Sequence, residues 1–101
     1  MLTPMPPLRH ETPLDPAVLV AYVGHYELRP GVVMMITLQN NQLYAQLTGQ
    51  NRFPVHPEGE RCFFYTIIDA QIIFDVEANG EASWLTHHQN GLDHRAPRIE
   101  A

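Results

Sequence analysis

Apolar and polar residues alternate along most of the chain after Gly24, which is the pattern of half-buried β-strands. The clearest case is the pair of stretches 32–39 and 42–49, which flank Asn40-Asn41. With these asparagines as a two-residue turn, one face of the hairpin is apolar and the other is mostly polar. The apolar cross-strand pairs are then Leu38 with Leu43, Ile36 with Ala45, and Met34 with Leu47.

Six more stretches have the composition of short strands, and each is bounded by glycine, asparagine or proline. They cover residues 25–28, 52–57, 61–68, 70–78, 82–89 and 92–99. Pro54 and Pro57 predict that 52–57 is an edge or bulged strand, because proline cannot donate a ladder hydrogen bond. The succession of hairpins predicts an all-β fold, a small eight-stranded antiparallel up-and-down barrel, with a sandwich as the alternative. Such a barrel is filled mainly by side chains and admits at most one small ligand.

One short helix is predicted ahead of the strands. Asp15 is a favourable N-cap, and Pro16 suits the first helical position, where its missing N–H costs nothing. Gly24 is placed to end the segment. We therefore predict a helix of about two turns that runs from Pro16 to Tyr22 or Val23.

The length of 101 residues is enough for one domain. Residues 1–14 contain four prolines and predict a linker or tail, which leaves 15–101 for the barrel. No apolar run approaches the ~20 residues that span a bilayer. The N-terminus does not resemble a signal peptide, although the chain could be a fragment of a longer exported protein. The single cysteine, Cys62, permits no internal disulfide and is expected to be a small buried hydrophobe.

The charge distribution argues against polyanionic partners. The net charge is −5, there is no lysine, and the six arginines are scattered along the sequence. Nucleic-acid backbones and anionic membrane surfaces attract clustered positive charge. We therefore expect no nucleic-acid binding and no membrane insertion.

Several motifs in a fixed order carry a family resemblance. They are Tyr22-Val23-Gly24 with Tyr26, Leu43 to Gly49, Arg52-Phe53-Pro54, Phe63-Phe64, Asp69-Ala70, Phe74, and His88-Gln89-Asn90-Gly91. In these positions the chain resembles the lipocalin-like C-terminal accessory domain of unknown function found in serine hydrolases. Those hydrolases are of the β-lactamase and penicillin-binding type and include related self-compartmentalising peptidases.

The resemblance implies a lipocalin-like barrel with one short N-terminal helix and an accessory role, with the chemistry in another domain. It also implies a periplasmic or secreted location if the chain is part of a longer exported protein. It supplies no ligand. The Ser-x-x-Lys motif of such hydrolases is absent from the sequence, which has no lysine.

Three histidines lie close together near the C-terminus. With Asn90-Gly91 as a two-residue turn, His87 faces His94 and His88 faces Asp93. His87 and His94 could both reach one metal ion, but a zinc site needs three or four ligands. Possible additional ligands, which the sequence does not place nearby, are His25, His10 and Glu27. A cross-strand polar pair at the barrel rim is the favoured interpretation, so we expect no metal and no cofactor; His88 with Asp93 has no nucleophile beside it and predicts no catalysis.

Candidates for binding a small ligand are Tyr44, Tyr65, Trp84 and Arg52. For the aromatic residues, core packing is the simpler interpretation. The guanidinium of Arg52 could recognise a carboxylate or form a surface pair with Glu58 or Glu60.

Two functions remain open on the sequence. The first is a non-catalytic accessory or interaction domain that packs on a hydrolase domain or associates with itself, for example as a homodimer. The alternative is a small-molecule-binding barrel with its ligand inside or at the mouth. Enzymatic activity of the chain alone is not expected, because no nucleophile–base pair can be assembled.

Overall fold

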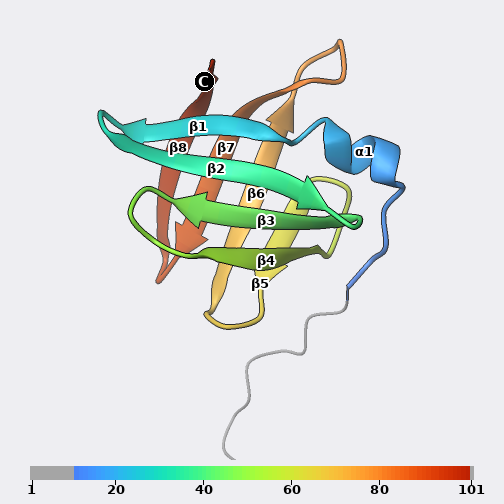
Figure 1. Cartoon of the computed structure of the whole chain (residues 1–101), viewed down its shortest axis with the longest axis horizontal. Helices are drawn as coiled ribbons and strands as arrows, with labels where there is room; N and C mark the ends of the chain where they lie inside the picture. Colours follow the sequence, from blue (N-terminus) through green and yellow to red (C-terminus); the bar gives the residue numbers. More distant parts are fainter. Residues whose placement is uncertain (1–10, 101) are drawn as a thin grey trace, which may run out of the picture.

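The computed structural model describes residues 11–100, in which eight antiparallel strands form one closed barrel (Figure 1). Each strand pairs with the next along the chain, and β1 pairs with β8. The elements are α1 (Pro16–Val20), β1 (Gly24–Arg29), β2 (Val32–Gln39), β3 (Gln42–Leu47), β4 (Arg52–Pro57), β5 (Cys62–Tyr65), β6 (Ala70–Val76), β7 (Ala82–Gln89) and β8 (Leu92–Ile99). The predicted all-β barrel with one short helix is therefore confirmed.

The barrel has two distinct ends. The strands β1 to β4 form one wall, which crosses the wall formed by β5 to β8 (Figure 1). We call the end that carries α1, the 40–41 turn and the loops 58–61 and 77–81 the helix end. The opposite end, with the connections 30–31, 48–51, 66–69 and 90–91, is the far end. Within residues 11–100, no helix has the length and apolar character needed to cross a membrane.

The turn chemistry sets the predicted registers. Asn40 and Asn41 have φ values of 53° and 63°, which belong to the left-handed region of a two-residue hairpin turn. Leu38 then pairs with Leu43, and the two other predicted apolar pairs of this hairpin follow. Asn90 and Gly91 adopt the same conformation, with φ values of 55° and 75°. Both hairpin registers inferred from the sequence are confirmed.

Helix α1 is shorter than predicted. Its start is as expected, since Oδ1 of Asp15 accepts a hydrogen bond from the Ala17 N–H at 2.8 Å and Pro16 opens the first turn. The helix ends at Val20 instead of Tyr22 or Val23, and Gly24 is the first residue of β1 rather than the helix stop. Tyr22 is buried in the barrel core, with 2% of its surface exposed. The helix ends before this residue, and the Tyr22 ring packs among the core side chains.

Two predictions about β4 and β5 are wrong. β4 is neither an edge strand nor a bulged one, because it pairs with β3 on one side and β5 on the other without a shift in register. Its prolines are tolerated because Pro54 lies beyond the last β4–β5 pair, Val55 with Tyr65, and Pro57 is the final residue of the strand. β5 ends at Tyr65, whereas strand structure was predicted through residue 68. The residues that follow form an exposed loop.

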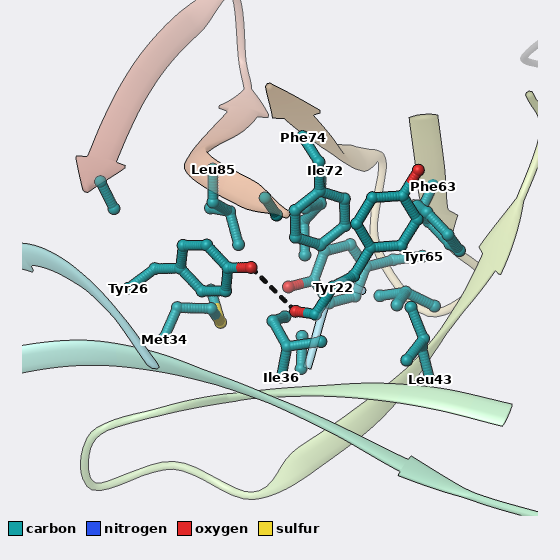
Figure 2. Packing of buried hydrophobic residues seen from close by; sticks show 14 of the residues in the cluster. Tyr22, Tyr26, Met34, Ile36, Leu43, Phe63, Tyr65, Ile72, Phe74 and Leu85 are labelled. Atoms are coloured by element: carbon teal, nitrogen blue, oxygen red, sulfur yellow. Dashed lines mark hydrogen bonds between the residues drawn. The ribbon is translucent and has the colours of Figure 1, made fainter. Parts of the chain in front are cut away.

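Aromatic side chains fill the helix-end half of the interior (Figure 2). The Tyr22 ring stacks on Phe74 with centroids 4.4 Å apart and meets Phe63 edge to face at 5.5 Å. Its hydroxyl donates to the carbonyl oxygen of Glu60 at 2.6 Å, and the Tyr26 hydroxyl donates to the carbonyl oxygen of Tyr22 at 2.8 Å. Rings of this size bury much apolar surface, and their hydroxyls are paired. A ligand in this part of the barrel would have to displace them.

The barrel closes between its first and last strands. Tyr26 of β1 pairs with Arg98 of β8, so Pro97 lies within a paired strand near the closure point. The Arg98 guanidinium donates to the carbonyl oxygens of Val23 at 2.6 Å and Ala82 at 3.2 Å. Gly24 leaves room for it, since a Cβ there would lie 2.9 Å from the Arg98 Nε. The Arg98 side chain therefore links β8 by hydrogen bonds to the residue before β1 and to the start of β7.

Cys62 differs from the expectation of a buried hydrophobe. It lies half-buried on the outer face of β5, next to the inward-facing Phe63. Its Sγ is 3.6 Å from Oε2 of Glu58 and 3.7 Å from Nε2 of Gln71. The thiol is therefore in a polar environment.

Candidate functional sites

His87 and His94 meet at the far end of the barrel as predicted, directly opposite each other on β7 and β8. Burial, followed by the proximity of His94 and then His88, lowers the pKa of His87, which favours the neutral imidazole. The His87 ring meets the Tyr65 ring edge to face, with ring centroids 5.9 Å apart. Burial raises the pKa of Tyr65 to about 12, so its phenol remains protonated at neutral pH and offers no anionic ligand.

Two of the additional metal ligands considered for this pair, His25 and Glu27, do not reach it. His25 and Glu27 flank the inward-facing Tyr26 on β1, so both lie on the outer face of the barrel. His10 lies outside the described residues. Within the described part of the chain, no three His, Cys, Asp or Glu side chains lie close enough together to hold a metal ion.

His88 and Asp93 form the second predicted pair, on the outer face of the same two strands. Nδ1 of His88 is in hydrogen-bond contact with Oδ1 of Asp93. The His88 side chain is 42% exposed and the Asp93 side chain 61%. In this arrangement the carboxylate orients an imidazole that points into solvent.

The four residues predicted to bind a ligand do not converge. Tyr44 and Arg52 lie together on the outer face of β3 and β4, with the guanidinium carbon 4.2 Å from the centre of the Tyr44 ring. Arg52 also donates to Oε1 of Gln39 at 2.8 Å. Trp84 lies on β7, which is separated from β4 by two strands and from β3 by three, and Tyr65 is buried inside the barrel.

Trp84 belongs to a separate surface cluster. The Arg95 guanidinium lies over the indole, 4.5 Å from the ring centre, and donates to Oδ2 of Asp75 at 2.7 Å. Each of these three side chains is more than a third exposed. These contacts join β6, β7 and β8 on the outer face of the barrel.

A cleft lies at the helix end, and none of the residues that line it was among the ligand-binding candidates predicted from the sequence. It lies between the mouth of the barrel and the segment formed by residues 11–19, and its volume is about 270 Å³. Leu43, Val55 and Phe63 contribute to it from the barrel, and all three are at most 1% exposed. The segment 11–14 is held beside the mouth by a hydrogen bond from the Thr12 N–H to the carbonyl oxygen of Pro57 at 2.6 Å. No sequence signal marks this cleft, because its lining comes from four separate parts of the chain.

Residues 8–97 match the family described as Domain of unknown function (DUF3471). The chain belongs to this family. It is also 28% identical over 87 residues to Penicillin-binding protein 4* of Bacillus subtilis (strain 168). That match covers 86% of this chain and 19% of the relative, so the chain spans about a fifth of the length of the curated protein it matches. No solved structure shows significant similarity. The resemblance to a domain of unknown function in β-lactamase-related hydrolases is confirmed.

Proposed function

We propose that this chain is a non-catalytic accessory domain that packs on a hydrolase domain of the penicillin-binding type or associates with a second copy of itself. The observation that carries the proposal is that nearly the whole chain matches a minor part of a penicillin-binding protein. A domain that forms part of a larger protein is expected to act together with the other domains of that protein. The absence of lysine, and hence of Ser-x-x-Lys, supports a role without serine-hydrolase chemistry.

The far end of the barrel is the surface best suited to such packing. Of the five large apolar side chains that are exposed in the described residues, three lie there: Ile67 at 55%, Ile68 at 40% and Leu92 at 61%. The pairing of Ala70 with Gln89, and of Gln89 with Leu92, places the 66–69 loop beside the 90–91 turn. A local group of exposed apolar residues is typical of a protein interaction site.

The test uses the whole chain and two binding partners. Its association with itself is measured by light scattering over a concentration series. Its association with Penicillin-binding protein 4* from which the matching region has been deleted is measured by biolayer interferometry. We expect binding in at least one of these experiments, weakened at least ~10-fold by Ile68→Asp combined with Leu92→Asp.

Val20→Asp is the matched control, because Val20 is 58% exposed on α1 at the opposite end and its substitution should leave binding unchanged. A chain that remains monomeric and does not bind the truncated relative would contradict the proposal. Equal weakening by the control variant would contradict the choice of surface. Hydrolysis of a chromogenic cephalosporin by the chain alone would contradict the non-catalytic role.

A further inference from the structure

The interior of the barrel is not covered equally at its two ends. At the helix end, Tyr22 and Phe63 are buried and fill the space between the walls. At the far end, Leu47 and Phe53 face inward, since Leu47 lies two residues from the buried Ala45 and Phe53 pairs with that alanine. Both of these side chains are only partly buried. The inward-facing layer at the far end therefore keeps some contact with solvent.

The same layer contains the two opposed histidines. His87 and His94 lie two residues from Leu85 and Ala96, which are both fully buried, so the imidazoles lie on the interior side of β7 and β8. His87 is half-buried and His94 is exposed. Leu92, one of the exposed apolar residues of the far end, lies on the same side of β8 as His94. The histidine pair is therefore next to the apolar surface proposed for docking.

The groups that β5, β6 and β8 place against His87 carry no negative charge. β6 places Ile72 opposite His87, β8 places His94 opposite it, and Tyr65 of β5 meets its ring edge to face. The phenol of Tyr65 is neutral, because burial raises its pKa to about 12. Burial, followed by the proximity of His94 and then of His88, lowers the pKa of His87. A proton on His87 is therefore already disfavoured in the free domain.

A partner that covers the far end removes water from this pair. Of the nearby carboxylates, Asp93 contacts the histidine at position 88 on the outer face, and Asp69 belongs to the exposed 66–69 loop. Because Ile67, Ile68 and Leu92 make the exposed surface apolar here, the complementary surface of the partner is expected to be apolar as well. An imidazolium that loses water and gains no opposite charge is strongly disfavoured. Docking therefore favours the neutral form of both imidazoles.

The partner that we assign to this surface is a hydrolase domain and not a second copy of the chain. Stable interfaces between separate proteins use roughly 20–30 residues on each side. The large exposed apolar residues of the far end number three in the described part of the chain. Domains of one polypeptide have a high effective concentration, so a small surface is enough to hold them together. In Penicillin-binding protein 4* the matching region is 19% of the protein, and the remainder of that polypeptide is such a neighbour.

We propose that docking of the far end on a penicillin-binding hydrolase domain is coupled to loss of a proton from the pair His87 and His94, so that acidification weakens the contact. This inference rests on the proposed function and adds its regulation. Contact with the partner disfavours the protonated pair, so the complex binds fewer protons than the free domain and weakens as the pH falls. Because the pKa of His87 is already lowered in the free domain, this imidazole should contribute on the acidic side of its ordinary value of 6.5.

The test measures the affinity of docking as a function of pH. The whole chain is titrated onto immobilised Penicillin-binding protein 4* that lacks the matching region, by biolayer interferometry at steps between about pH 7.5 and 5. The Kd should rise by at least ~3-fold across this range, with a ceiling of ~10-fold per pH unit for each proton lost. Circular dichroism of both proteins at each pH verifies that they remain folded.

Variants assign the proton to the pair. His87→Gln combined with His94→Gln should remove the pH dependence, since glutamine does not titrate. His25→Gln is the matched control, because His25 lies on the outer face at the start of β1, and its substitution should leave the pH dependence unchanged. If the double variant does not fold, the unmodified chain still decides the question. Calorimetry in two buffers of different ionisation enthalpy should show a net release of protons on binding at about pH 6.

The outcomes separate this inference from the function on which it rests. Binding with a Kd that is independent of pH would overturn the coupling and leave the docking function intact, whereas no binding at any pH would overturn both. The coupling also fails if its pH dependence persists in the folded double variant, or if binding at about pH 6 releases no protons. Association of the chain with itself, without binding to the truncated relative, would overturn the choice of partner.

Discussion

Tyr22 should contribute more to stability than any other side chain that enters the barrel from the helix segment. Its replacement in Tyr22→Ala removes the stack on Phe74, the edge contact with Phe63 and the hydrogen bond to Glu60. Loss of a buried aromatic side chain costs about 3–5 kcal/mol. A domain of this length has a total free energy of unfolding of roughly 5–15 kcal/mol, so the variant should be severely destabilised.

Urea unfolding, monitored by circular dichroism, measures this loss of stability. A second variant separates the contribution of the ring from that of the hydroxyl. Tyr22→Phe keeps both ring contacts and removes only the hydroxyl, so it should lose about 0.5–1.5 kcal/mol. Tyr44→Ala serves as the control, because Tyr44 is a half-buried tyrosine on the outer face; loss of its contact with Arg52 should cost about 0.5–1 kcal/mol.

The reasoning about Tyr22 fails if Tyr22→Ala loses no more than Tyr44→Ala. It also fails if Tyr22→Phe is as unstable as Tyr22→Ala, because the ring contacts would then contribute nothing.

Three further predictions concern the far end, the closure and a turn. The free energy of unfolding should fall as the pH drops through the ordinary histidine range near 6.5, because burial lowers the pKa of His87 and protons then bind preferentially to the unfolded chain. His87→Leu should flatten this dependence in urea titrations between about pH 7.5 and 5, and an unchanged slope would refute the assignment. Gly24→Ala should cost about 1–3 kcal/mol by crowding Arg98, and the cost should shrink in an Arg98→Ala background, as a double-mutant cycle can measure. Asn41→Ala should lower stability by about 1–2 kcal/mol, since φ is 63° there, whereas Asn41→Gly should not; thermal unfolding of both variants distinguishes them.

The sequence predicts the fold well because local turn chemistry and strand periodicity agree. Asn40-Asn41 and Asn90-Gly91 each permit only a short list of turns, and each turn fixes which side chains share a face. The pairing of His87 with His94 followed from this alone. Proline was less informative for β4, because its effect depends on where the neighbouring strand ends, and β5 ends at Tyr65.

The candidate sites were harder to predict, because the sequence does not show which strands converge. Tyr44 and Trp84 are both aromatic residues on the outer face, yet three strands separate β3 from β7 in either direction around the barrel. The cleft depends on how the segment before α1 lies across the mouth, which no periodicity encodes. The role of Arg98 at the closure of the barrel was likewise not predicted. Its acceptors are the backbone carbonyls of Val23 and Ala82, which no residue type in the sequence marks.

The pairing of β1 with β8 has a consequence for biosynthesis. Tyr26 can pair with Arg98 only after β8 has left the ribosome, so one side of the first strand stays unpaired until the last strand has been synthesised. Contacts between residues so far apart in sequence make folding slow. Before β1 and β8 pair, the growing sheet has two exposed edge strands, which can pair with strands of another polypeptide. Truncation before residue 92 should therefore yield insoluble aggregates instead of a smaller soluble barrel.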